Sequence, residues 1–211
     1  MTVRSFGFLM FPDFEELDLV GPWEMATMWR ALAGGPRCLA VAAQPGVIRC
    51  AKGLGVVADH GFDDCPALDY LLVPGGAGTR VAMQDGPTLE FLRRQAAGAR
   101  AVLSVCTGSI VLAAAGLLDG RAATTHWKAI PRLRAYPAVT LREERWVRDG
   151  TIWTSAGVSA GIDLLLAFIA AEDGEEAASA AQAGAEYYPD GRIYRSATRR
   201  PEAPSYVGDL T

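Results

Sequence analysis

Cys106 is the residue whose neighbours are most typical of a catalytic nucleophile. It follows an apolar run of strand length (residues 101–105) and precedes a small, apolar, helix-like segment (107–115). Small residues stand two places before and after it, Ser104 and Gly108, as a nucleophile elbow requires. An elbow presents its side chain near the positive end of the following helix, which favours a thiolate. A buried cysteine that only packs is the alternative, but the strand–Cys–Thr–Gly–helix order favours a nucleophile.

Asp18 is a candidate proton-transfer partner. It lies between Leu17 and Leu19, in a segment with four acids (residues 13–22), so its side chain is expected to face away from two apolar neighbours. A carboxyl group beside Cys106 can take and return the proton that a cysteine nucleophile exchanges. A solvated loop aspartate or a helix cap explains the same residue. The residues alone therefore leave its role undecided.

Gly75 and Gly76 follow a buried strand at residues 70–73. Glycines let the backbone turn tightly and point N–H groups inward. Together with the amides of Cys106 and Thr107, these groups can hold developing negative charge. An ordinary turn between a strand and a helix is the alternative. The run contains neither GxGxxG nor GK[ST], so it gives no support for nucleotide binding.

Two further residues are candidates near the cysteine. The hydroxyl of Thr107 either caps the following helix or also contacts a substrate. His126 is the histidine nearest to Cys106 in the sequence, and a Cys–His pair is the usual way to activate a thiol. A single partly buried histidine that other groups satisfy is the alternative. The remaining cysteines are interpreted as packing residues: Cys38, Cys50 and Cys65.

The composition is that of a soluble globular protein. The chain has 211 residues, of which half are hydrophobic and 21% charged, and its net charge of −4 argues against a nucleic-acid surface. The apolar run near the start is too short for a signal peptide or a membrane span. Four cysteines without CxxC spacing and two histidines offer little for a metal site, so neither metal nor cofactor is expected. Reduced thiols indicate a cytoplasmic protein.

Alternating strands and helices predict an α/β protein with a mostly parallel sheet covered on both faces. The expected strands are residues 4–11, 38–43, one or two within 47–57, 70–73, 101–105, 140–147 and 152–155. The expected helices are 22–32, 87–97, 107–115, 128–136, 160–171 and 175–185, with Pro22 opening the first. We expect a single domain over residues 1–185 and an extended tail over 186–211. Sites in such sheets form beyond the carboxyl ends of strands, where Asp18, Gly75, Gly76 and Cys106 converge.

The chain resembles the ThiJ/PfpI superfamily, whose members are related to class I glutamine amidotransferases. The resemblance covers roughly residues 4 to 171, and its clearest segments are GFLMFPDFEELDLVGP (7–22), VPGGAG (73–78), SVCTGSIVLAAAGLLDGRAATTHW (104–127) and ERWVRDGTIWTSAGVSAGIDLLL (144–166). Within the superfamily the isonitrile hydratase branch is the most similar. The sequence around Cys106 also resembles that in the sensor halves of AraC-type regulators. The resemblance implies a flavodoxin-like three-layer sandwich with a nucleophile elbow.

The resemblance also implies roles for individual residues. Cys106 is the implied nucleophile, Asp18 its acid–base partner and Thr107 an assisting residue, while Val158 lies in a turn over the nucleophile and lines the substrate. Protease-like and glyoxalase-like relatives have a histidine directly after the cysteine. Thr107 stands there in this chain and favours the hydratase branch, as does an aspartate at position 18 where many relatives have glutamate.

The expected activity is hydration of an isonitrile to an N-substituted formamide. The expected partners are a small-molecule substrate and, as in related folds, a second copy of the chain in a homodimer, with no nucleic acid and no membrane. The alternative is a non-catalytic small-molecule or redox sensor related to the AraC-type sensor halves. A short tail and an acidic net charge argue against DNA binding by this chain.

Overall fold

The centre of the protein is a six-stranded sheet. In the computed structural model, which describes residues 4–189, the strands lie in the order β2-β1-β5-β6-β10-β9. All neighbours pair in parallel except β9 and β10, which form an antiparallel hairpin. The strands are β1 (Ser5–Leu9), β2 (Arg37–Val41), β5 (Tyr70–Val73), β6 (Ala101–Ser104), β9 (Trp146–Asp149) and β10 (Ile152–Ser155). The predicted α/β fold with a mostly parallel sheet is confirmed.

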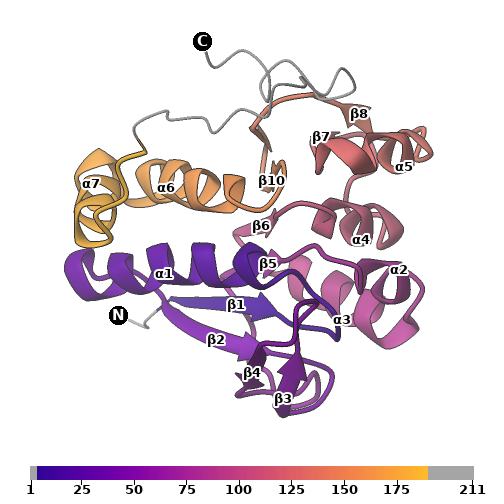
Figure 1. Ribbon diagram of the computed structural model, residues 1–211, viewed down its shortest axis with the longest axis horizontal. Coiled ribbons are helices and arrows are strands. Elements are labelled where there is room, and N and C mark those ends of the chain that lie inside the picture. Colours follow the sequence, from indigo (N-terminus) through magenta and orange to yellow (C-terminus); the bar gives the residue numbers. More distant parts are fainter. Residues whose placement is uncertain (1–3, 190–211) are drawn as a thin grey trace.

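Helices cover both faces of this sheet, which gives three layers (Figure 1). One group packs together on one face: α1 (Glu16–Ala33), α6 (Ala160–Asp173) and α7 (Glu175–Gly184). The other face carries α2 (Thr79–Ala82), α3 (Gly86–Ala96), α4 (Gly108–Ala114), the 3₁₀ turn η1 (Trp127–Ala129) and α5 (Ile130–Arg134). Within the part of the chain that the structure describes, no helix is both long and apolar enough to cross a bilayer.

Two small sheets lie outside the central one. An antiparallel hairpin is formed by β3 (Gly46–Arg49) and β4 (Gly55–Ala58), and a parallel pair by β7 (Ala122–Ala123) and β8 (Thr140–Leu141). The single strand predicted over residues 140–147 is therefore wrong. The chain pairs with β7 up to Leu141 and then crosses to the central sheet, where β9 pairs with β10.

The first helix begins earlier than predicted. Pro22 does not open it; α1 begins at Glu16 and the proline lies inside the helix. Proline removes the hydrogen bond to the carbonyl group four residues earlier, which here belongs to Asp18. Packing compensates for this loss, because Pro22 is buried and Gly161 lets α6 approach its ring: a Cβ on Gly161 would lie 3.0 Å from Pro22 Cγ. The packing of Pro22 against α6 thus outweighs the preference of proline for the first turn of a helix.

A buried aromatic ring ties the helices to the sheet. Phe168 of α6 has no exposed surface and meets four other rings edge-on, with centroid distances between 5.1 and 6.2 Å. These rings belong to Phe6 of β1, Trp29 of α1, Tyr70 of β5 and Trp153 of β10. The contact fixes α1, and with it the start of that helix, against the strands whose ends carry the candidate site.

The end of the described chain turns back onto α6. The hydroxyl of Tyr187 donates a hydrogen bond to Asp163 Oδ1 at 2.9 Å. Residues 186–189 thus contact the domain rather than extend from it. The rest of the predicted tail, residues 190–211, lies outside the described residues.

Candidate active site

Cys106 lies at the turn between β6, which ends at Ser104, and α4, which begins at Gly108. Its backbone has a φ of 56°, in the left-handed region that residues other than glycine rarely adopt. Gly108 is required by close approach, because a Cβ there would lie 2.2 Å from the carbonyl oxygen of Val73. The strand, the strained residue and the helix together form the turn that the sequence predicts.

Hydrogen bonds hold this strained residue from both sides. The N–H of Cys106 donates to the carbonyl oxygens of Ser155 and Ala156, at 3.1 and 3.0 Å. The carbonyl oxygen of Cys106 accepts from the hydroxyls of Ser109, at 3.2 Å, and Thr125, at 3.0 Å. The end of β10 and the segment after β7 therefore determine where the sulfur points.

Asp18 is buried in the first turn of α1, with no exposed surface. Its Oδ2 accepts a hydrogen bond from the N–H of Gly75 at 2.8 Å. Its Oδ1 accepts none of ordinary geometry within residues 4–189, although the neighbouring Cys106 thiol acts on the carboxyl group as a weak donor. Burial excludes a solvated loop aspartate, and the N-cap residue of α1 is Glu15, so Asp18 is not a cap.

Burial decides the protonation of both groups. Desolvation raises the pKa of Asp18 to about 7; the Gly75 N–H opposes this rise, while the charge of Glu15 adds to it. Desolvation, and then the charge of Asp18, raise the pKa of the Cys106 thiol to about 12. The Thr107 amide at the start of α4 lowers the thiol pKa, as the sequence predicts, but Cys106 is only 6% exposed and desolvation outweighs this effect, so the thiol rather than the thiolate is favoured.

Thr107 links the cysteine to the loop after β5. Its Oγ1 accepts hydrogen bonds from the N–H of Gly76 at 3.0 Å and from the hydroxyl of Thr79 at 3.2 Å. The hydroxyl makes no capping bond to α4, so the capping alternative is not what the structure shows. Thr107 instead fixes the loop over the cavity.

Of the four backbone amides expected near the sulfur, only that of Thr107 acts on it. Gly75 and Gly76 already donate to a carboxylate and a hydroxyl, and the Cys106 amide donates to β10. The backbone N–H groups that act on the sulfur belong to Thr107 and Val158. The resemblance places Val158 in the turn over the nucleophile, but only the structure shows that its backbone N–H acts on the sulfur, because a backbone group leaves no trace in residue type. Its φ of 45°, an outlier for a β-branched residue, marks it only once the structure is known.

A cavity of about 300 Å³ opens onto Cys106. Four of the other predicted site residues line it: Gly76, Thr107, His126 and Val158. Charged residues contribute the rest of its polar wall: Glu15, Arg80, Lys128 and Arg132. The structure thus brings the predicted residues together at the carboxyl edge of the sheet, with Gly75 and Asp18 buried behind the cavity wall.

His126 does not pair with the thiol. Its Nδ1 accepts a hydrogen bond from the backbone N–H of Lys128 at 3.1 Å, which assigns the ring proton to Nε2. Burial, and then the charge of Lys128, lower the pKa of His126, so the ring is neutral at physiological pH. No hydrogen bond joins it to Cys106 in the described structure. His126 is a wall residue with a neutral donor.

Location rather than acidity distinguishes Cys106 from the other thiols. Burial raises the pKa of Cys38 to about 12 and those of Cys50 and Cys65 to about 11. All three are free, and none of them lines the cavity beside Asp18. Among residues 4–189, no group of three or more His, Cys, Asp or Glu side chains is placed to hold a metal ion.

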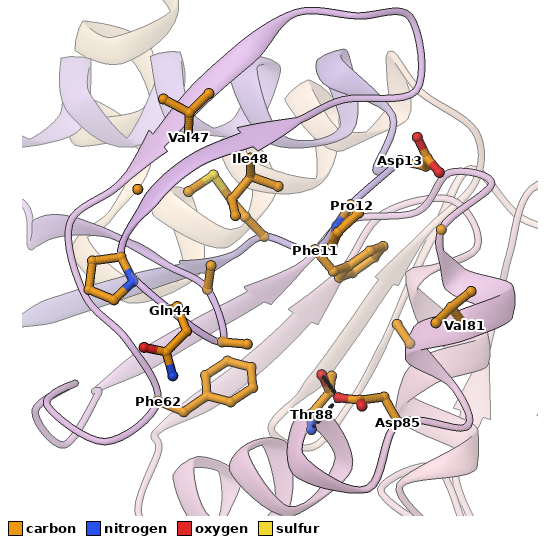
Figure 2. A pocket seen from close by; sticks show the side chains of 17 residues that line it. Phe11, Pro12, Asp13, Gln44, Val47, Ile48, Phe62, Val81, Asp85 and Thr88 are labelled. Atoms are coloured by element: carbon orange, nitrogen blue, oxygen red, sulfur yellow. Dashed lines mark hydrogen bonds between the residues drawn. The ribbon is translucent and has the colours of Figure 1, made fainter.

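A larger cavity, of about 510 Å³, lies between the β3–β4 hairpin, the end of β1 and α2. Figure 2 shows its apolar wall, including Phe11, Val47, Ile48, Phe62 and Val81, and the hydrogen bond from Thr88 to Asp85. No cysteine or histidine lines it. Size alone favours this cavity, but the thiol and the buried carboxyl group belong to the smaller one.

Comparison with known proteins identifies relatives over most of the chain. The model of the DJ-1/PfpI family matches residues 4–171. The isonitrile hydratase of Pseudomonas putida is 43% identical over 195 residues, which cover 87% of this chain and 78% of that protein. The HTH-type transcriptional regulator GbdR of Pseudomonas aeruginosa is 33% identical over 84% of this chain but only 49% of the regulator, so the chain spans about half of it.

Solved structures agree with these matches. A THiJ/PfpI family protein from Pseudomonas syringae has a TM-score of 0.86 and 36% identity, covering 98% of this chain and 84% of that one. DJ-1beta of Drosophila melanogaster has a TM-score of 0.78 at 18% identity, over 89% of this chain and all of its own, which shows the shared fold alone. The resemblance inferred from the sequence is confirmed.

The Gly75 position has no room for a side chain. A Cβ there would lie 2.5 Å from the Thr107 amide nitrogen and 2.7 Å from Asp18 Oδ2. We expect Gly75→Ala to displace both groups and to lower the free energy of unfolding by about 1–3 kcal/mol, measured by urea denaturation. Gly86→Ala is the matched control, because no atom lies within 4 Å of its Cβ. Equal losses in the two variants would contradict this packing.

The raised pKa of Asp18 makes stability depend on pH. Its pKa is about 7 in the folded protein against an ordinary 3.8, so between these values the folded state binds more protons than the unfolded state. Stability therefore falls as pH rises through this window. We expect Asp18→Asn to gain on the order of 2–4 kcal/mol relative to wild type between about pH 4 and pH 8. Urea denaturation at both pH values, with exposed Asp59→Asn as control, tests this; a difference independent of pH would contradict it.

Proposed function

The chain belongs to the DJ-1/PfpI family, and from this premise we propose that it hydrates isonitriles to N-substituted formamides. Cys106 is the nucleophile and Asp18 the acid–base group. The observation that carries the proposal is the thiol of Cys106, which lies on a strained backbone beside a cavity and next to the buried carboxyl group of Asp18. The 43% identity to an isonitrile hydratase over most of both chains supports this choice of substrate.

The first step joins sulfur to the isonitrile carbon. That terminal carbon is uncharged and electrophilic, so it suits a soft sulfur nucleophile. Because burial keeps Cys106 as a thiol, attack needs a base, and Asp18 Oδ1 is free to accept the proton. Sulfur bonds to the carbon, and Asp18 delivers the same proton to that carbon. The product is a thioimidate, R–N=CH–S–Cys106, and Asp18 is a carboxylate again.

The second step adds water across the C=N bond. Asp18 takes a proton from water as the oxygen bonds to carbon and passes that proton to the nitrogen, which leaves Asp18 as a carboxylate. The tetrahedral species then collapses: the C–S bond breaks, sulfur recovers the hydroxyl proton and the formamide leaves. The amides of Thr107 and Val158 stabilise negative charge on the departing sulfur. One water is consumed and nothing is oxidised or reduced.

A sensor function has less support. The regulator relative matches this chain over about half of its own length. Redox sensing by direct oxidation favours an exposed thiol of low pKa, whereas Cys106 is buried and burial raises its pKa. The geometry therefore favours acid–base chemistry on a small molecule.

Replacement of the nucleophile tests the proposal. Cys106→Ala is expected to lower formamide production from a panel of uncharged isonitriles by at least about 1000-fold, because the covalent step is lost. Mass spectrometry of the product measures turnover, and circular dichroism checks that the fold is retained. Cys65→Ala, at a free thiol outside the cavity, is the matched control. Turnover by Cys106→Ala at the wild-type rate would refute the mechanism.

The proton relay also sets the pH profile. Since the carboxylate form of Asp18 accepts the thiol proton, kcat/KM is expected to rise as pH passes about 7 and then to level off. Asp18→Asn is expected to be much slower and to lose this rise. Steady-state kinetics from about pH 5 to 9 measure both. A wild-type profile that falls through this range would show that Asp18 is needed in its protonated form instead.

A further inference from the structure

Basic residues outnumber acidic ones on the wall of the cavity above Cys106. Arg80 of α2, Lys128 of η1 and Arg132 of α5 all line it, and Glu15 is the single acid among its lining residues. The whole chain has a net charge of −4, so the excess of positive charge at this cavity is opposite in sign to the charge of the protein as a whole. Lys128 and Arg132 come from the consecutive elements η1 and α5, and the distant helix α2 supplies Arg80.

None of the three cations has a carboxylate partner among the residues that the structure describes. Arg132 Nη2 contacts Met83 Sδ at 3.5 Å, and Lys128 Nζ lies 5.1 Å from the centroid of the Trp127 ring. The Arg80 side chain makes no hydrogen bond or ion pair within residues 4–189. Other arginines of the protein do have carboxylate partners: Arg4, Arg100, Arg121, Arg134 and Arg145.

The acid on the wall is already offset. Lys52, in the turn between β3 and β4, forms an ion pair with Glu15, and its backbone N–H donates to Glu16 Oε1 at 2.7 Å. Lys52 does not itself line the cavity. With Glu15 paired, Arg80, Lys128 and Arg132 give the cavity a positive electrostatic potential. Walls of low dielectric constant strengthen such a potential inside a cleft.

His126 adds a donor to the same wall. Its Nδ1 is occupied by the Lys128 amide, so the free ring position is an N–H. Three cations and one neutral donor suit a group that only accepts hydrogen bonds and carries negative charge, such as a carboxylate. The isonitrile end, by contrast, must reach the sulfur uncharged.

We propose that the substrate is an isonitrile that also bears a carboxylate, held by Arg80, Lys128 and Arg132 while the isonitrile carbon faces Cys106. The inference rests on the proposed hydratase function and names the substrate class of the same site. A cavity of about 300 Å³ limits the substrate to a small molecule.

The test compares isocyanoacetate with its uncharged methyl ester. The expected kcat/KM for the carboxylate is at least about tenfold higher, and Lys128→Gln and Arg132→Gln are each expected to reduce that ratio by about threefold. High salt is expected to reduce it too, because the Debye length falls from about 10 Å at 0.1 M to about 3 Å at 1 M. Arg134→Gln is the matched control, on the same helix but outside the cavity wall, and is expected to keep the ratio.

The outcomes separate this inference from the proposed function. If the ester is hydrated as well as the carboxylate and the variants leave the ratio unchanged, the inference is wrong and the hydratase function stands. If neither compound is hydrated, the hydratase function fails, and alkylation of Cys106 decides whether the cavity attracts anions.

Alkylation by iodoacetate and by uncharged iodoacetamide is measured by mass spectrometry of the Cys106 and Cys65 peptides. An iodoacetate-to-iodoacetamide ratio that is higher at Cys106 than at Cys65, and that Lys128→Gln lowers, supports anion binding. Equal ratios at both cysteines, with no effect of the variant, overturn it.

Discussion

The hydrogen bond from the Gly75 amide to Asp18 Oδ2 is the contact on which the site depends. It joins the first turn of α1 to the end of β5, and β5 is the strand against which Gly108 lets α4 pack. Oδ2 accepts this bond, whereas Oδ1 has no hydrogen-bond partner of ordinary geometry among the described residues, so the proposed proton exchange with the thiol uses Oδ1. A side chain on Gly75 would disrupt this contact, because its Cβ would lie 2.7 Å from Asp18 Oδ2. The geometry of the candidate site is thus a consequence of how closely three backbone segments approach one another.

Desolvation, more than the helix dipole, sets the chemistry of the pair. The amides of Thr107 and Val158 favour negative charge on sulfur, but burial of Cys106 and the nearby Asp18 oppose it more strongly. The resting site therefore holds a thiol beside a carboxyl group that titrates near neutral pH. The proposed mechanism therefore starts with proton transfer within the pair rather than from a permanently ionised sulfur.

Much of this arrangement could be predicted from the sequence. Alternating apolar runs and glycine turns indicated the parallel sheet, and the small residues around Cys106 indicated the elbow. The early start of α1 could not be predicted, because Pro22 is tolerated only through the close approach of Gly161. The resemblance indicates Val158 as a site residue, but residue types reveal neither the action of its backbone N–H on the sulfur nor the protonated state of that sulfur, which depends on burial depth. Of the cations on the cavity wall, Lys128 and Arg132 are close in sequence, but only the fold brings Arg80 of α2 beside them.

Cys106 and Val158 are two of the four described non-glycine residues with a positive φ, and their conformation affects how this protein tolerates change. Each such conformation costs about 1–3 kcal/mol, and a whole domain is typically stable by only about 5–15 kcal/mol. A sizeable share of the folding margin is therefore spent on shaping the two residues around the sulfur. The aromatic contacts of Phe168 and the rest of the core must supply that share. Mutations that weaken the core would therefore lower the amount of folded protein before they changed the geometry around the sulfur.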